Sequence, residues 1–215
     1  MSTRSLTLVP VDDSRESEAT LEYAIRIAQS AHADIHVIHV VPRGQIARRG
    51  SAAARAVREK VVRQWPLARR AGVRLQLVTL HGPAVDVIPA HAELHAASLI
   101  VIGRSYGSTR FLRHSGVVSR LARRTSTRVL VAPTEAGFPG FDKLKHVLAA
   151  VDFTVASAMA VTVAAELSRW SGGRLSLLHA MAPRDGSAFS GGAARRVARR
   201  ARAEASTLAE RLRRK

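Results

Sequence analysis

The sequence predicts an α/β fold, in which a doubly wound parallel sheet of five strands is followed by a shorter β-α-β-α module. Three observations carry this prediction. Strand-like and helix-like segments alternate five times before residue 133, a Gly- and Pro-rich segment follows them, and the opening pattern then begins again. Strands that alternate with helices favour a parallel sheet that is covered by helices on both faces.

The first two elements are an apolar run at residues 6–11 and the helix that follows it. The run has the length and composition of a buried strand. Beyond it, apolar residues recur at the spacing of one helix face, at Leu21, Ala24, Ile25 and Ala28. Asp13 followed by Glu16 fits a capping box at the start of this helix, and Ser14 is the alternative cap.

The remaining elements continue the alternation. Short apolar runs predict strands at residues 35–41, 74–80, 98–102 and 128–131. Longer segments predict helices at residues 53–70, 84–96 and 116–124. Ligands of doubly wound sheets bind at the carboxyl ends of the strands, so Asp12 after the first strand and Gly103 after the fourth are expected at one crevice.

We expect three parts in the chain: a complete module at residues 1–134, a linker at residues 135–143 and a truncated second module at residues 144–215. Gly and Pro in the linker mark a loop. A shift of 140 positions without gaps aligns the two modules, pairing Leu8 with Leu148, Asp12 with Asp152, Ser17 with Ser157, His39 with His179 and Arg55 with Arg195. A register kept over that length indicates a tandem repeat.

The second module stops before the counterpart of the third strand. Two parallel strands alone leave both edges without hydrogen-bond partners and cannot bury both faces. We therefore expect residues 145–151 and 174–180 to be shielded by the first module, as an intramolecular pseudo-dimer, or by a second chain in a homodimer.

The composition excludes several classes of site. The chain has no cysteine, which excludes disulfides, thiolate metal sites and cysteine nucleophiles. Its apolar runs are far shorter than the roughly 20 residues of a membrane span, and its N-terminus lacks a secretory signal pattern, so we expect a cytoplasmic protein. The formal net charge of +18 favours polyanions such as RNA or nucleotides, and solvated arginine-rich helix faces are the alternative explanation.

Two motifs lie at the expected crevice. Val11, Asp12 and Ser14 give Val-Asp-x-Ser after the first strand, and the segment after the fourth strand carries Gly103, Gly107 and Gly116. Glycines let backbone amides approach a phosphate closely, and a helix N-terminus adds partial positive charge. In both motifs the chain resembles the universal stress protein family, which has Val-Asp-x-Ser after its first strand and G-x-x-G-x9-G, followed by Ser or Thr, after its fourth.

The glycine segment departs from the family pattern at two positions. The outer glycines keep the family spacing, but the middle one is displaced by one residue, with Tyr106 in its place. Val117 stands where the family has a hydroxyl residue. Nearby Arg104, Arg110 and Arg113 offer charge-assisted contacts that would offset the altered glycines.

The resemblance implies a fold, a ligand and an assembly. The fold is adenine nucleotide alpha hydrolase-like, with strand order 3-2-1-4-5. The protein would be a stress-response factor that binds ATP or a related adenine nucleotide with its associated magnesium, and any hydrolysis would be slow. The implied cofactor-binding residues are Asp12, Val40, Gly103, Gly107, Gly116, Val118 and Ser119. Family members commonly dimerise through the fifth strand, here residues 128–131.

A competing hypothesis is an RNA- or ribosome-associated protein that uses the fold as a scaffold. Its polyanion-binding candidates lie near the C-terminal end, at Arg195, Arg196, Arg199, Arg200 and Arg202. Aromatic residues are scarce there, which favours contacts with phosphates over base recognition.

Two further expectations concern isolated residues. No metal site is expected beyond the magnesium of a nucleotide, and His91 and His95, four apart on a helix, are interpreted as a solvated helix face. Asp152, the counterpart of Asp12, is interpreted as a helix cap, because the glycine segment has no second copy.

Overall fold

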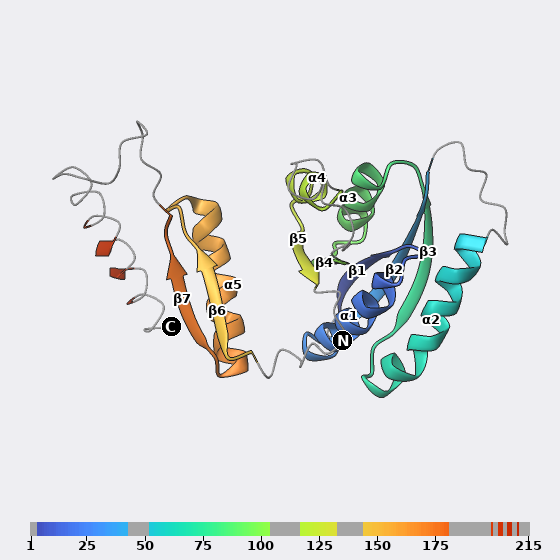
Figure 1. Cartoon of the computed structure of the whole chain (residues 1–215), viewed down its shortest axis with the longest axis horizontal. Coiled ribbons are helices and arrows are strands. Elements are labelled where there is room, and N and C mark those ends of the chain that lie inside the picture. The colour runs from blue at the N-terminus through green and yellow to red at the C-terminus, as the bar shows by residue number, and fades with distance from the viewer. Residues whose placement is uncertain are drawn as a thin grey trace. The chain divides into compact units, whose positions relative to one another are not determined.

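The computed structural model describes residues 4–42, 52–103, 117–132 and 144–180, together with residues 199, 202, 203, 206, 207 and 210. The chain divides into two compact units, Met1–Phe138 and Pro139–Lys215. Their helices and strands are labelled in Figure 1.

The first unit contains a parallel sheet of five strands in the order β3-β2-β1-β4-β5 (Figure 1). The strands are β1 (Ser5–Val11), β2 (Ala33–Val41), β3 (Leu75–His81), β4 (Leu99–Gly103) and β5 (Arg128–Ala132). Between them lie α1 (Glu16–Ser30), α2 (Ala52–Arg70), α3 (Ala84–Leu94) and α4 (Val117–Arg124). The predicted fold class and strand order are confirmed.

β1 lies at the centre of the sheet, where the strand order reverses. It pairs with β2 along its whole length, from Ser5 opposite Ala33 to Val11 opposite His39. On its other side it pairs with β4, with Thr7 opposite Leu99. The chain therefore leaves the carboxyl ends of β1 and β4 in diverging directions, which opens a crevice between them.

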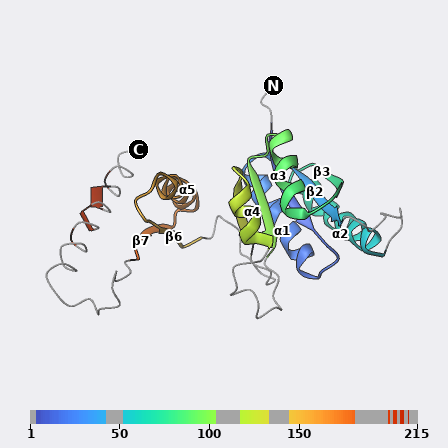
Figure 2. The same cartoon turned by 90° about the horizontal axis from the view of Figure 1, so that it is seen from above.

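Both faces of the sheet are apolar and covered by helices, which flank the strands in Figure 2. On one face Leu8 and Ile38 pack in a cluster with Ile88 of α3 and Leu121 of α4. On the other face α1 packs against β1, β2 and β4, and its Ile25 is completely buried. Burial on both faces explains why the strands are nearly continuous apolar runs in the sequence.

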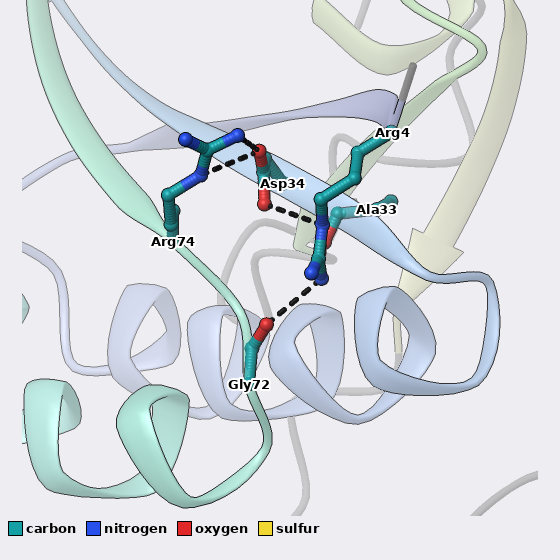
Figure 3. A network of polar contacts seen from close by, with 5 residues as sticks. All are labelled: Arg4, Ala33, Asp34, Gly72 and Arg74. Atoms are coloured by element: carbon teal, nitrogen blue, oxygen red, sulfur yellow. Dashed lines mark hydrogen bonds and ion pairs between the residues drawn. The ribbon is translucent and has the colours of Figure 1, made fainter. Parts of the chain in front are cut away.

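The amino ends of β1, β2 and β3 are tied together by one carboxylate (Figure 3). Asp34 Oδ1 lies 2.9 Å from Arg4 Nε, and its Oδ2 accepts from Arg74 Nε and Nη2 at 2.9 and 2.6 Å. Arg4 Nη2 also donates to the Gly72 carbonyl at 2.8 Å. Burial raises the pKa of Asp34, but the hydrogen bonds from Arg74 and the charges of Arg74 and Arg4 outweigh it and hold the pKa below its ordinary value.

The second unit contains a parallel pair of strands, β6 (His146–Ala150) and β7 (Arg174–Leu178), joined through α5 (Val155–Ser171). Its core is small and is formed by Ala149, Val151, Val161 and Ala164. The described residues from 199 to 210 are helical. The first three elements of the predicted β-α-β-α order are therefore present, whereas the final helix and the shielding of the two strands stay predictions. None of the helices in the described ranges has the length and apolarity needed to cross a membrane.

Candidate functional site

A cavity of about 290 Å³ lies at the carboxyl ends of β1, β2 and β4 and at the N-termini of α3 and α4. Most of its wall is apolar, with Pro10, Val11, Ile38, Val40, Ala84, Ile88, Ile102, Val117 and Val118. Its polar side is formed by Asp12, Ser14, Glu16, Ser17 and Thr20, and Gly103 closes the end of β4. An apolar wall with few polar groups on one side is typical of small-molecule sites.

The structure brings four of the seven predicted cofactor-binding residues to this cavity, namely Asp12, Val40, Gly103 and Val118. Ser119 lies in the first turn of α4 and is not part of the lining. Gly107 and Gly116 lie outside the described residues, as do the arginines of the glycine segment. The role of all seven in holding a nucleotide stays a prediction.

Asp12 is held by the turn that follows β1. Its Oδ1 accepts from Ser14 N at 3.0 Å, from Ser14 Oγ and from Ser17 Oγ at 2.6 Å. Its own backbone N–H donates to Ser17 Oγ at 3.0 Å. These bonds fix the carboxylate at the edge of the cavity. Burial raises the pKa of Asp12, but the hydrogen bonds from Ser14 and Ser17 and the charge of Lys60 together lower it below its ordinary value, so the group is ionised near neutral pH.

The predicted cap of α1 is wrong. The helix begins at Glu16, and the N-cap position is occupied by Arg15, which makes no side-chain capping bond. The hydroxyl of Ser14 is bonded to the Asp12 carboxylate instead, because short polar side chains compete between caps and local turns. Asp12 therefore belongs to the turn before the helix rather than to its cap.

Lys60 holds the backbone of the turn that carries Asp12, and this role was not predicted from the sequence. Its side chain is only 7% exposed, and its Nζ donates to the carbonyl of Asp12 at 3.3 Å and to the carbonyl of Ser14. One signal was present in the sequence: Lys60 falls on the same helix face as the buried residues Val57 and Val61. A cation in an apolar stripe needs a buried polar partner.

Gly103 has a packing reason that involves no ligand. A Cβ at this position would lie 2.3 Å from Oγ1 of Thr20 on α1. That hydroxyl is held in place because it donates to the Glu16 carbonyl at 2.9 Å. The glycine therefore permits α1 to approach the end of β4 closely.

The corresponding turn of the second unit corrects another expectation. Asp152 Oδ1 accepts from Thr154 N at 3.0 Å and from Thr154 Oγ1 at 2.6 Å. Thr154 Oγ1 in turn accepts from Ser157 N at 3.3 Å, so Thr154 is the cap of α5 and Asp152 is not. Asp152 lies two residues before the cap, where its carboxylate reaches the turn and not the free N–H groups of the helix. The hydrogen bonds from Thr154 lower the pKa of Asp152 to about 2.

The solvated helix face predicted for His91 and His95 is present only in part: His95, at the C-cap of α3, is exposed, whereas His91 on α3 is buried. His91 is 9% exposed, and its Nε2 lies 3.1 Å from His36 Nδ1 on β2. His95 completes a cluster, with its ring centroid 4.2 Å from that of His91 and 5.3 Å from that of His36. The spacing of four residues in the sequence places His91 and His95 near each other. The packing of α3 on the sheet adds His36 of β2 to them. Across the described ranges, no three His, Asp or Glu side chains are arranged to hold a metal ion.

The basic C-terminal segment is described only in part. Arg199 and Arg202 are helical and exposed, whereas Arg195, Arg196 and Arg200 lie outside the described residues. Binding of a polyanion there stays a prediction.

Comparisons with known proteins agree with this fold. A sequence model of the universal stress protein family matches residues 7–133. A solved universal stress protein in complex with cAMP is 24% identical, with a TM-score of 0.50, over 62% of this chain and 100% of that chain. A universal stress protein from Archaeoglobus fulgidus DSM 4304 is 20% identical, with a TM-score of 0.61, over 85% of this chain and 68% of that chain. No curated protein matches the chain in a sequence search.

The structural similarities show the fold, and the family match covers more than half of the chain, including most of β1, the Asp12 turn and β4. The chain belongs to the universal stress protein family.

Proposed function

We propose that the first unit binds ATP or a related adenine nucleotide in the cavity between Asp12 and Gly103, as a cytoplasmic stress-response binding protein. The observation that carries the proposal is the cavity itself, in which an ionised carboxylate faces apolar walls and the N-terminus of α4. The similar universal stress protein that was solved in complex with cAMP holds an adenine nucleotide, which supports this class of ligand.

The side of the cavity near Asp12 suits the base and the ribose. Ile38 and Val40 offer apolar surface to a flat ring. Oδ1 of Asp12 already accepts three hydrogen bonds, and among the described residues no donor reaches Oδ2. Oδ2 is therefore the atom that would accept from the amino group of a base or from a ribose hydroxyl.

The opposite side of the cavity suits the phosphates. Val117 and Val118, the first residues of α4, line it, and the first N–H groups of a helix have no intrahelical partners and carry partial positive charge. Asp12 and Glu16 place two carboxylates on the other side, which repel phosphate. Charge therefore orients the ligand with its base toward Asp12. Magnesium bound to ATP would accompany the phosphates and would add positive charge there.

Isothermal titration of the full chain with ATP, AMP and GTP tests the proposal. We expect binding of ATP and AMP to one site per chain. Guanine presents a carbonyl where adenine presents an amino group, so GTP is expected to bind about 10-fold more weakly or worse, as when a charged acceptor loses its donor. Absence of heat with millimolar ATP and AMP would remove the proposed function. Equal affinities for ATP and GTP would remove Asp12 from contact with the base.

A further inference from the structure

Lys60 is a buried cation beside the cavity that is not part of the lining. It lies on α2, where Val57 and Val61 are its buried neighbours on the same helix face. Burying an ammonium group is costly unless hydrogen bonds replace its water. The bonds from Nζ to the carbonyls of Asp12 and Ser14 supply that replacement. The position of this side chain is thus set by the turn after β1.

The two carbonyls belong to the turn that presents Asp12. Ser17 on α1 holds the carboxylate and the backbone N–H of Asp12 from one side. Lys60 on α2 holds the backbone carbonyls of Asp12 and Ser14 from another side. Without Lys60, the backbone of the turn would lose these two hydrogen bonds to α2 while the Ser17 bonds remain. The direction of the carboxylate would then be less well defined.

The charges around the turn give Lys60 a second effect. On α1, Glu16 lines the cavity, and Glu18 is paired with Arg63 of α2, whose Nε lies 2.9 Å from Oε1. The charge of Arg63 is therefore largely compensated, whereas Nζ of Lys60 is bonded to neutral carbonyls and acts on Asp12. Glu59, also on α2, is exposed to solvent. Lys60 is consequently the cation of α2 that favours the ionised form of Asp12.

We propose that Lys60 is a positioning residue for nucleotide binding: its ammonium group anchors the turn after β1 and so presents the Asp12 carboxylate to the cavity. The inference rests on the proposed function, since Lys60 acts on the ligand only through Asp12. It assigns to α2 a role in the site although α2 contributes no residue to the cavity wall.

Three variants of the full chain test this inference. Lys60→Met removes the charge and both hydrogen bonds while keeping an unbranched apolar stem. Lys60→Gln removes the charge and keeps a neutral donor. Arg58→Met is the matched control, because it removes one positive charge from an exposed position of the same helix. The readouts are the Kd for ATP by calorimetry, the pKa of Asp12 in the free protein by NMR, and the thermal melt as a check on folding.

We expect Lys60→Met to weaken ATP binding about 10-fold, the effect of losing a charge-assisted hydrogen bond, and to raise the pKa of Asp12. Lys60→Gln should raise that pKa with a smaller loss of affinity, and Arg58→Met should change neither. A change in folding stability alone would leave the pKa of Asp12 unmoved, so the titration separates positioning from simple support of the fold.

A folded Lys60→Met protein that binds ATP as the wild type does would overturn the inference, whatever its Asp12 pKa. If Lys60→Met does not fold, Lys60→Gln carries the same comparison. Failure of both to fold would also overturn it, in favour of a purely structural role. If the wild type binds no nucleotide, the proposed function fails, and a raised Asp12 pKa in the variants would still support Lys60 as the anchor of the turn.

Discussion

The two units begin with the same strand-helix-strand arrangement and bury it to different extents. Leu8 of β1 and Ile38 of β2 are 0% exposed, whereas the aligned Leu148 of β6 and Leu178 of β7 are 61% and 51% exposed. In the first unit α3 and α4 cover this face of the sheet. The described part of the second unit has no counterpart of these helices. A strand-helix-strand segment thus completes one face of its core, and the other face depends on elements that come later in the first unit.

The remaining face and the turn are alike in the two units. Val9 and the aligned Ala149 are both buried against the first helix of their unit. In both turns the backbone N–H two residues after the aspartate donates to its Oδ1 at 3.0 Å. The two units therefore share the turn and the strand face that packs on the first helix, and they differ in the burial of the opposite strand face. Paired substitutions at aligned positions can test that statement directly.

The largest difference is expected for Leu8→Ala and Leu148→Ala. Leu8→Ala leaves a cavity in a fully packed core and should lower the free energy of unfolding by about 2–5 kcal/mol. Leu148→Ala removes a mostly exposed side chain and should change it by about 0.5 kcal/mol or less when the predicted shielding of β6 is absent. Urea denaturation followed by circular dichroism measures both. Comparable losses in the two variants would mean that the outer face of β6 and β7 is covered in solution.

Asp12→Asn and Asp152→Asn should differ in nucleotide binding. Both residues hold the same kind of turn, but only Asp12 lines the cavity. Asp12→Asn should weaken ATP binding by about 10- to 100-fold, corresponding to a hydrogen bond to a charged group of about 1.5–3 kcal/mol, and Asp152→Asn should leave it unchanged. Calorimetric titration of the two variants measures this. Equal loss in both would show that the ligand does not recognise the cavity of the first unit.

The fold and the location of the cavity were predictable because they follow from local patterns. Buried strands are read from short apolar runs, and each predicted strand boundary of the first unit lies within two residues of the observed one, the largest difference being the start of β2 at Ala33. Asp12 and Gly103 were placed together by the rule that ligands bind at strand carboxyl ends, which depends only on strand order.

What the sequence did not predict depends on contacts between distant residues. The bond from Lys60 to Asp12 joins residues 48 positions apart, and that between His36 and His91 joins residues 55 apart. The hydrophobic periodicity of a sequence does not predict which side chains of two packed elements will be in contact. The predictions of the helix caps were wrong for a related reason. At both turns an aspartate accepts a hydrogen bond from the hydroxyl of the residue two positions later, Ser14 or Thr154. Only the geometry of the turn decides whether that hydroxyl also caps the helix.

Gly103→Ala and Gly172→Ala should both destabilise the protein, for different reasons. The new Cβ at position 103 would meet Thr20 Oγ1, so a loss of about 1–3 kcal/mol is expected from overpacking. Gly172 has a φ of +67° with nothing within 4 Å of an added Cβ, and its loss of about 1 kcal/mol would be backbone strain alone.

A second substitution separates the two causes. In a Thr20→Ala background, Gly103→Ala should lose most of its effect, measured as the coupling in a double-mutant cycle of thermal or urea unfolding. Additive losses would contradict the assignment of Gly103 to helix packing and would favour a constraint from the glycine segment itself.

The smallest difference concerns acid pH, because only the first unit has the histidine cluster. The position aligned with His36 in the second unit is Ser176. Burial lowers the pKa of His36 and His91 below 6.5, and the charge of His95 lowers both further. For His36, a hydrogen bond that it donates to Gln76 and the charge of Asp34 raise the pKa without reversing the shift.

The sign of the pH effect follows from these lowered values. Below pH 6.5 the unfolded chain binds more protons at His36 and His91 than the folded chain does. The free energy of unfolding is therefore highest above pH 6.5, and it decreases as the pH drops through the lower pKa values of the folded state. Melting temperatures between about pH 7.5 and about 5.5 should therefore decrease for the wild type, and His91→Gln should flatten this dependence while the exposed His81→Gln should not. A His91→Gln slope equal to that of the wild type would show that protons bind elsewhere, since no other described residue of α3 brings a buried imidazole against β2.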